Sequence, residues 1–190
     1  MNSPQTKTIR FSSAVSVTVP LLALLLLAAV SYGEEERHRL HRPRNVPAAL
    51  QVPAGNELSF HATGVGAQIY TWNGSIWVFK APHAVLFGSK EDEKGDMVGI
   101  HFAGPTWESN SGSAVVGTKV AAVTVDPDAI PWLKLQAKST SGVGIFADTT
   151  YIQRLDTVGG LAPAAPGSSV GEEALVPYIA EYFFYRASQH

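Results

Sequence analysis

Residues 68–79, with the sequence QIYTWNGSIWVF, decide the fold class of this chain. Runs of aromatic and β-branched residues lie on both sides of the dipeptide Asn73–Gly74. Such residues favour strands, and Asn-Gly tolerates the positive φ that a tight hairpin turn needs at both central positions. The stretch therefore predicts two antiparallel strands joined by a hairpin turn.

Alternating apolar residues predict further strands along the chain. In residues 132–138, WLKLQAK, every second residue after Trp132 is apolar and the residues between are polar, the pattern of a strand with one wet face. Other strands are predicted at 58–62, 84–87, 97–102, 115–125, 150–155 and 175–186. The last of these is apolar on both faces, which is typical of a central, doubly covered strand. Only residues 128–133 and 163–174 suggest short helices.

The glycine and proline content supports an all-β chain. There are 17 glycines and 12 prolines in 190 residues, and no long stretch after the N-terminal region has helical periodicity. These features predict a single antiparallel domain over residues 46–190, either a β-sandwich or a barrel-like fold, with a jelly roll among the alternatives.

The N-terminus has the pattern of a secretory signal peptide. Lys7 and Arg10 precede an apolar run from Ala14 to Val30, and small residues follow before the acidic residue Glu34. The alternative is an uncleaved membrane anchor, but the run is shorter than the roughly 20 residues that span a bilayer. Residues 1–33 are therefore predicted to be a signal helix that directs the protein out of the cell, to the medium, the cell wall or a periplasm.

Residues 34–45, EEERHRLHRPRN, are rich in charge and poor in apolar side chains. Such a segment contributes little to a core and is predicted to be a disordered tail. Its arginines and histidines also permit a metal or anion site, although a solvated tail explains the same residues.

Charge and cysteine content exclude several functions. The net charge is −2, and removal of residues 1–33 leaves 12 basic and 16 acidic residues, or about −4. A mildly acidic protein is a poor nucleic-acid binder, because phosphate binding needs clustered positive charge. The chain has no cysteine, which excludes disulfides, thiolate metal sites and cysteine nucleophiles. A membrane partner is expected only through an uncleaved signal segment.

Several motifs together resemble a known family. They are VPAGNEL (52–58), QIY (68–70), WVFKAP (77–82), HFAGPTWE (101–108), DPDAIPWL (126–133), TYIQR (150–154), TVGG (157–160) and VPYIAEYFFY (176–185). In this order they resemble the family called Domain of Unknown Function 3455. The resemblance implies an exported single-domain protein without an established activity.

Members of this family include proteins with an enzyme label, and many carry two cysteines that this sequence lacks. Some fungal relatives are labelled malate dehydrogenase, but this sequence has neither a strand-linked G-x-G-x-x-G nor alternating strands and helices. No cofactor is therefore predicted. Relatives often carry a cysteine where Thr71 stands here and another near Pro166 or Gly167. Their joint absence leads to the hypothesis that these two positions lie close in space.

The candidate catalytic residues are His101 and Glu108. If the chain turns at Gly104–Pro105, the two side chains could face each other as a base or metal site. Alternatively His101 is a structural residue that bonds a backbone carbonyl. A second candidate is a metal site built from His61, His83, His101 and Glu108, although their long spacings match no known ligand motif.

Aromatic residues form a third candidate site. Tyr70, Trp72, Trp77 and Trp107 could build a platform for carbohydrate or a cell-wall polymer, although alternating strand aromatics are more often core.

Three polar positions complete the candidates. Gln153 and Arg154 are candidate binding residues that could pair with Glu181 or Arg186 on a neighbouring strand. Asn73 begins an N-x-S sequence, which permits glycosylation in a eukaryotic host.

These observations favour a secreted β-sandwich module that binds a ligand or associates with the cell surface or wall. The alternatives are a small hydrolase or metal-assisted enzyme centred on His101 and Glu108, and a purely structural wall protein. No known catalytic motif is present, so a function other than catalysis is favoured.

Overall fold

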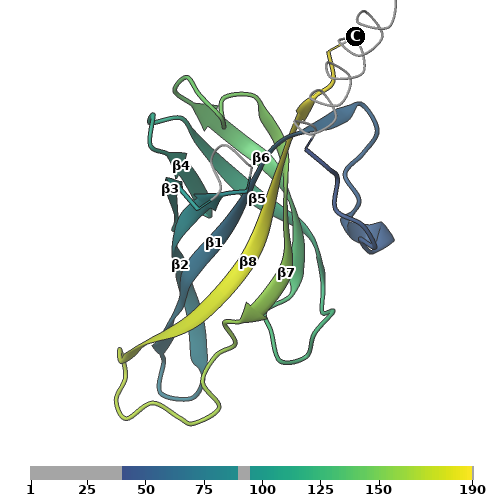
Figure 1. Ribbon diagram of the computed structural model, residues 1–190. Coiled ribbons are helices and arrows are strands. Elements are labelled where there is room, and N and C mark those ends of the chain that lie inside the picture. The colour runs from purple at the N-terminus through teal and green to yellow at the C-terminus, as the bar shows by residue number, and fades with distance from the viewer. Residues whose placement is uncertain (1–39, 90–94, 190) are drawn as a thin grey trace, which may run out of the picture. The chain divides into compact units, whose positions relative to one another are not determined.

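A computed structural model describes residues 40–89 and 95–189. Within these residues the chain forms a short 3₁₀-helix, η1 (Ala48–Leu50), and eight strands: β1 (Asn56–Trp72), β2 (Trp77–Gly88), β3 (Met97–Phe102), β4 (Thr106–Ser109), β5 (Ala114–Val123), β6 (Trp132–Ser141), β7 (Thr149–Gly159) and β8 (Glu173–Ala187). Each strand pairs antiparallel with the next, and β8 pairs with β1, so one sheet closes into a barrel (Figure 1).

The predicted antiparallel all-β class is confirmed, and the barrel is the correct alternative within it. Strand order around the barrel equals strand order in the chain. A sandwich or jelly roll would need two sheets with connections that cross between them. The predicted signal peptide and residues 34–39 of the predicted tail lie outside the described residues. In the part of the chain that the structure describes, no helix is long and apolar enough to cross a membrane.

The predicted hairpin is confirmed, with a longer turn than a two-residue loop. Trp72 pairs with Trp77, which leaves residues 73–76 in the turn. The Oδ1 atom of Asn73 accepts hydrogen bonds from the backbone N–H groups of Ser75 and Ile76, each at 2.9 Å. The asparagine side chain therefore closes the turn, and Gly74 supplies the positive φ, at 98°.

The remaining differences lie in short segments. Neither 128–133 nor 163–174 forms a helix. Strand β4 was not predicted, because four residues are too few to display a period of two.

The barrel interior is an aromatic and aliphatic core. Its buried members are Phe60, Ala62, Ala84, Leu86, Trp107, Val115, Ile130, Leu135, Phe146, Ile152, Tyr178, Ala180, Tyr182 and Phe184. At one end the ring of Phe146 lies 4.6 Å from that of Phe184 and 5.9 Å from that of Phe60. These phenylalanines close that end of the barrel.

Gly64 leaves space inside the barrel for one large ring. A Cβ atom built on Gly64 of β1 would lie 2.5 Å from the ring of Tyr182. The absence of a side chain on β1 therefore allows Tyr182 of β8 to lie inside the barrel.

A second apolar cluster lies on the outside of the barrel. Leu50 and Val52 cover Leu155, Phe183 and Tyr185. The C-terminal half of β8 is thus apolar on both faces because Phe184 faces the interior while its neighbours are covered from outside. The prediction that both faces of this strand are covered is correct for its C-terminal half. In the other half, Leu175 and Ile179 are exposed.

The N-terminal segment is also held by polar contacts. The Nε2 atom of Gln153 donates a 2.7 Å hydrogen bond to the carbonyl of Leu50, and the Tyr185 hydroxyl donates to Gln153. Arg42, in the predicted tail, lies over the ring of Tyr185 at 5.1 Å.

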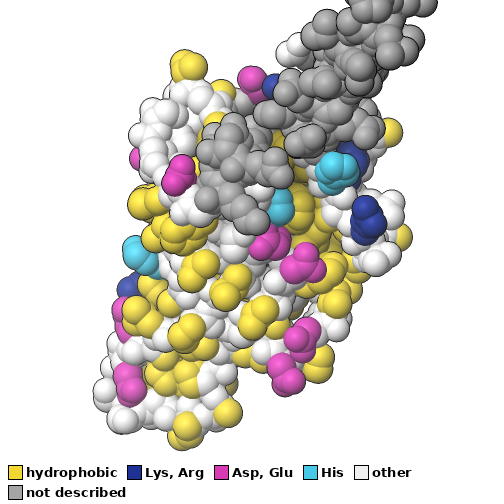
Figure 2. Space-filling view, viewed as in Figure 1, with side chains coloured by type: hydrophobic (Ala, Val, Ile, Leu, Met, Phe, Trp, Pro, Cys, Tyr) yellow, Lys and Arg dark blue, Asp and Glu magenta, His cyan; other side chains and the backbone are white. Residues whose placement is uncertain are grey.

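Apolar side chains also gather on an exposed face of the barrel, over β1, β8 and β7 (Figure 2). Val65 pairs across strands with Val85 on one side and Ile179 on the other, and Ile179 pairs with Val158. The row runs perpendicular to the strands.

The short strands β3 and β4 leave the barrel wall incomplete on one side. Strand β3 pairs with β2 only from Ala84 to Phe87, and β4 pairs with β5 only up to Val116. The first half of β2 and the second half of β5 therefore have no β3 or β4 partner between them. We call this gap in the hydrogen-bonded wall the notch.

Candidate ligand-binding cavity

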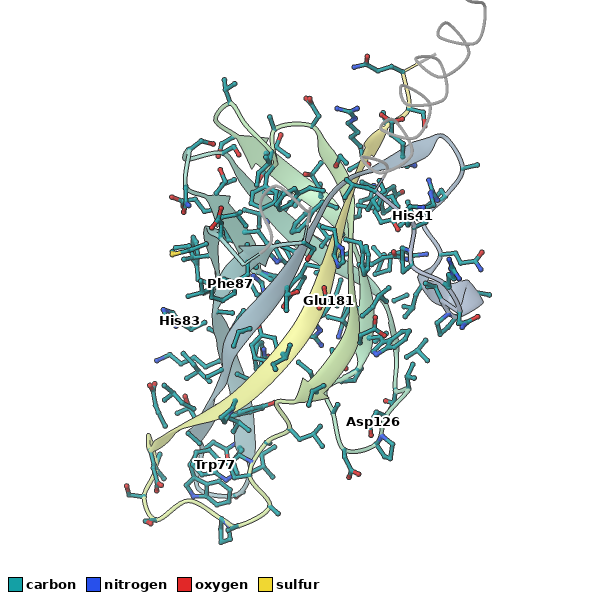
Figure 3. The ribbon with its side chains drawn as sticks, in the orientation of Figure 1. His41, Trp77, His83, Phe87, Asp126 and Glu181 are labelled. Atoms are coloured by element: carbon teal, nitrogen blue, oxygen red, sulfur yellow. The ribbon has the colours of Figure 1, made fainter. Side chains whose placement is uncertain are left out.

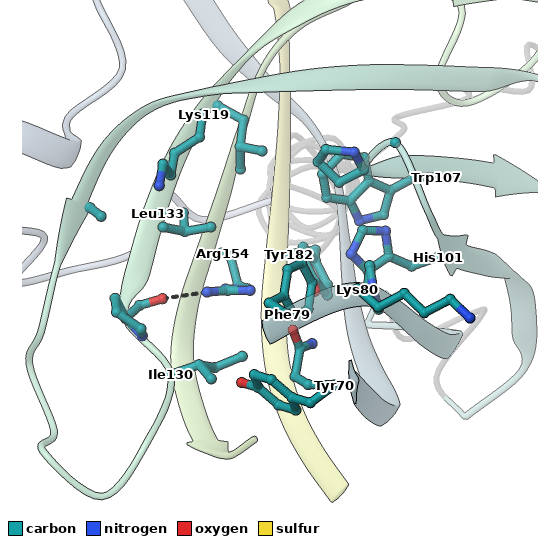
Figure 4. Close-up of a pocket in the computed structure, with 17 residues that line it drawn as sticks. Tyr70, Phe79, Lys80, His101, Trp107, Lys119, Ile130, Leu133, Arg154 and Tyr182 are labelled. Atoms are coloured by element: carbon teal, nitrogen blue, oxygen red, sulfur yellow. Dashed lines mark hydrogen bonds between the residues drawn. The ribbon is translucent and has the colours of Figure 1, made fainter. Parts of the chain in front are cut away.

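A cavity of about 490 Å³ occupies the barrel interior beside the notch (Figure 4). The residues that line one side are aromatic: Tyr70, Phe79, His101, Trp107 and Tyr182. Ile130, Leu133 and Leu135 supply an aliphatic lining. Three cations also line it, Lys80, Lys119 and Arg154, and none of its described lining residues is acidic.

The cavity reaches solvent where its lining residues are exposed. Phe79 is 50% exposed on the β2 side of the notch, and Lys119 and Ala122 are exposed on the β5 side. Lys119 and Ala122 both face the cavity although they are three residues apart, because a β-bulge between Lys119 and Ala121 shifts the alternation. A small molecule could enter between these two edges.

Arg154 carries the most unusual charge in the cavity. Strand β7 places it between Leu133 of β6 and Tyr182 of β8, its partners across the strands. Its Nη2 atom donates a 2.8 Å hydrogen bond to the carbonyl of Pro131. Its Nε atom is buried without a hydrogen-bond partner, and within the described residues no carboxylate forms an ion pair with it.

Two further donors in the cavity lining lack an acceptor. Nε2 of Gln68 and Nε1 of Trp107 are buried without a hydrogen-bond partner, as is Nε of Arg154. Buried polar groups normally have a partner, and an unsatisfied one costs about 1–3 kcal/mol. Three N–H donors on one cavity therefore mark it as a place for acceptor atoms.

His101 is buried beside these donors as a neutral ring. It stacks on Trp107 with 4.3 Å between ring centroids, and its Nδ1–H donates a 2.8 Å hydrogen bond to the carbonyl of Thr106. Burial lowers the pKa of His101 to about 3, the Thr106 carbonyl opposes that shift, and the Arg154 charge adds to it. His101 is thus uncharged at physiological pH.

The tyrosine hydroxyls in the barrel are uncharged as well. Tyr70 donates a 2.7 Å hydrogen bond to the carbonyl of Gly160, and the hydroxyls of Tyr178 and Tyr182 lie 3.1 Å apart. Burial raises the pKa of each of the three, although the positive charge of Arg154 works in the opposite direction. They serve as hydrogen-bonding groups rather than as acids near neutral pH.

The structure does not bring His101 and Glu108 together. His101 pairs with Trp107 and faces the interior, whereas Glu108 pairs with Ile100, whose side chain is exposed. Adjacent strand positions point to opposite faces of a sheet. The chain turns at Gly104–Pro105 as expected, but that turn places the two side chains on different sides of the barrel wall.

The histidines are also separated. His61 lies outside the barrel, where its Nε2 is 2.6 Å from Glu181, and Thr63 donates to the same carboxylate at 2.9 Å. His83 is exposed at the outer edge of β2 (Figure 3). Among residues 40–89 and 95–189, no three histidine or acidic side chains form a group that could hold a metal ion.

The four aromatic candidates divide into two pairs. Tyr70 and Trp107 line the cavity. Trp72 and Trp77, 5.4 Å apart, lie at the hairpin end, where Nε1 of Trp77 donates to the carbonyl of Ala165. The same loop packs on Trp72, since a Cβ atom on Gly167 would lie 2.5 Å from its ring. This contact is made by Trp72 and not by Thr71, so the proximity of Thr71 to Pro166 or Gly167 stays a prediction.

The remaining candidates also separate. Gln153 points outward to the N-terminal segment and Arg154 points inward. Arg186 instead forms a 2.8 Å ion pair with Glu57. Asn73 is exposed in the hairpin turn.

Several lining residues were not candidates, notably Gln68, Lys119 and Tyr182. They lie on three different strands, and no local motif connects them. The available signal was a polar residue on an otherwise apolar strand face, as with Gln68 between Gly66 and Tyr70.

One comparison with known proteins gives a match. The family described as protein of unknown function (DUF3455) matches residues 53–186. No curated protein and no solved structure matches the chain.

Proposed function

The chain belongs to the family of unknown function DUF3455, and we propose that it is a binding protein that holds a small, largely apolar molecule inside its barrel. The cavity volume of about 490 Å³ falls within the range of roughly 300–1,000 Å³ that is usual for small-molecule sites. Its mixed aromatic and aliphatic lining suits an apolar ligand.

The observation that carries this proposal is the set of unpartnered donors. The buried N–H groups of Gln68, Trp107 and Arg154 all belong to residues that line the cavity. Ligand sites typically combine an apolar lining with a few polar groups that orient the bound molecule. A ligand with acceptor oxygens would satisfy these donors while its apolar part replaces water on the cavity wall.

The ionisable groups favour binding over acid–base catalysis. A histidine with a pKa of about 3 is a weak base, and the raised pKa of Tyr182 makes it a weak acid. General acid–base groups work best when their pKa lies near the working pH. The lining thus supplies shape, charge and hydrogen bonds rather than a proton donor and acceptor pair.

The proposed setting is outside the cell. The pattern of residues 1–33 supports export. A cavity of this size encloses a small molecule rather than a polymer chain, so the proposed ligand is a small compound of the exterior and not the wall polymer itself.

The test is to block the notch. Ala122 is exposed and lines the cavity, so Ala122→Trp should fill the opening with little effect on folding. Val120→Trp is the matched control, because Val120 is exposed on the same strand and does not line the cavity. The probe is 8-anilinonaphthalene-1-sulfonate, a fluorescent sulfonate with a large apolar aromatic part.

The wild type and the Val120 variant should bind the probe with one-to-one stoichiometry, and Ala122→Trp should weaken binding at least tenfold. Equal binding by all three proteins would place the probe on the outer apolar face and contradict the proposal. Lack of binding by the wild type would contradict it too.

A further inference from the structure

We propose that the ligand is a planar aromatic carboxylate whose carboxylate group binds Arg154. This inference rests on the proposed function and adds the chemical class of the ligand.

The charge balance of the cavity favours an anion. Arg154 is half-buried and its Nε atom is fully buried without a partner, and a charge withdrawn from water is normally paired. Two of the cations that line the cavity, Lys119 and Arg154, form no ion pair among the described residues. The third, Lys80, pairs with Glu173, which does not line the cavity. The buried side chains of His101, Tyr178 and Tyr182 around Arg154 are neutral. A ligand carboxylate would supply the missing negative charge.

Arg154 is held in position for such a group. The hydrogen bond from Nη2 to Pro131 fixes the plane of the guanidinium, and Nε–H remains without an acceptor. Figure 4 shows the guanidinium lying between the aliphatic residue Leu133 and the ring of Tyr182. Arginine binds carboxylates through two parallel N–H groups, with stronger hydrogen bonds than a neutral pair.

The two walls favour a flat ring. On the aromatic side, the ring centroids of Tyr70 and Phe79 are 5.7 Å apart. The rings of His101 and Trp107 each make an edge-to-face contact with the ring of Tyr182. On the other side are Leu133 and Leu135. Aromatic rings prefer edge-to-face and offset contacts with other rings. The phenylalanines that close the barrel end limit the depth available to a long alkyl chain.

The experiment compares two compounds of nearly equal shape by isothermal titration calorimetry. The probes are naphthalene-1-acetate and its neutral analogue 2-(naphthalen-1-yl)ethanol, with dodecanoate as the alkyl carboxylate. We expect the wild type to bind naphthalene-1-acetate at least tenfold more tightly than either other compound. In Arg154→Gln the affinity for the acetate should fall at least tenfold, whereas the affinity for the alcohol should change less than threefold.

The comparison on the wild-type protein needs no variant, so the proposal is testable even if Arg154→Gln does not fold. Equal affinities for acetate and alcohol would overturn the anionic ligand and leave the proposed cavity binding intact. Tighter binding of dodecanoate would overturn the aromatic part of the inference. Failure of all three compounds, together with failure of the fluorescent probe, would overturn the proposed function itself.

Lys138→Met is the matched control for general charge. Lys138 is exposed on β6 and does not line the cavity, so its charge is screened by solvent. Its loss should reduce affinity for naphthalene-1-acetate less than threefold at 0.15 M salt. A loss as large as that of Arg154→Gln would show that net charge, and not the guanidinium, selects the ligand, and would overturn the assigned role of Arg154.

Discussion

At the scale of single residues, Arg154 and His101 define what the cavity can do. Both lie on otherwise apolar inward faces: His101 is buried and neutral, whereas Arg154 is half-buried and its Nε atom has no hydrogen-bond partner. An unpaired cation inside a ligand-free protein lowers stability, whereas the same cation in a complex binds an anion. Functional sites commonly show this conflict between stability and activity.

Arg154→Met should therefore stabilise the ligand-free protein, by about 1 kcal/mol, because it replaces an unpaired charge by an apolar side chain of similar length. Urea denaturation without ligand would measure the free energy of unfolding. A loss of stability would mean that the hydrogen bond to Pro131 outweighs the cost of the half-buried, unpaired charge.

His101 should make stability depend on pH. Its pKa is about 3 in the folded protein and near 6.5 when unfolded. Below pH 6.5 the unfolded chain takes up a proton that the folded protein excludes, so stability falls by about 1.4 kcal/mol per pH unit down to about pH 3.

Urea denaturation at pH 7 and pH 5 should detect this effect. His101→Phe keeps the stacking on Trp107 and removes the titrating group. The loss of stability between the two pH values should be about 2 kcal/mol smaller in the variant than in the wild type. Identical losses in both proteins would contradict the buried neutral histidine.

At the scale of elements, strands that are distant in sequence set the position of the segment around η1 and the location of the notch. Residues 46–52 have no strong pattern in the sequence, yet they cover Phe183 and Tyr185 of β8. The doubly apolar pattern of residues 175–186 predicted that something covers this strand. The pattern could not show which segment covers the strand, because that depends on which residues lie close to β8 in the folded chain and fit its surface.

Leu50→Ala should destabilise the domain by about 3 kcal/mol, because Leu50 is fully buried in this outer cluster. Ala49→Ser, at the exposed neighbour, should change stability by less than about 0.5 kcal/mol. Thermal and urea denaturation of both variants would measure the difference. Equal stabilities would mean that η1 is not packed on the barrel.

At the scale of the whole molecule, the barrel joins all eight strands in one hydrogen-bonded ring, so ligand binding inside it should stabilise the entire domain. A ligand at 100 times its dissociation constant adds about 2.7 kcal/mol. Naphthalene-1-acetate should therefore raise the melting temperature of the wild type and leave that of Ala122→Trp almost unchanged. Equal shifts in both proteins would indicate binding outside the cavity.

Export can be tested on the same scale. Protein recovered from the medium, wall or periplasm of its host should have an intact mass that begins near residue 34, in agreement with the small residues before Glu34. Full-length protein retained in the membrane would support the anchor instead.

The sequence by itself determined the antiparallel all-β class, most strand positions and the hairpin turn that begins at Asn73. These follow from local chemistry: side-chain alternation, the φ preference of Asn-Gly, and the positions of glycine and proline. Only the tertiary structure decided that the sheet closes on itself and which residues share its interior. A period of two distinguishes two faces of one strand, but it does not say which residues of distant strands meet.

The candidate site shows the same limit. His101 and Glu108 are close in sequence and lie on opposite faces of the wall, whereas Gln68, Trp107 and Arg154 are distant in sequence and line one cavity. The bulge between Lys119 and Ala121 also changes which β5 residues face inward. Strand pairing, register and closure set these relations, and they arise from long-range contacts that no local pattern encodes.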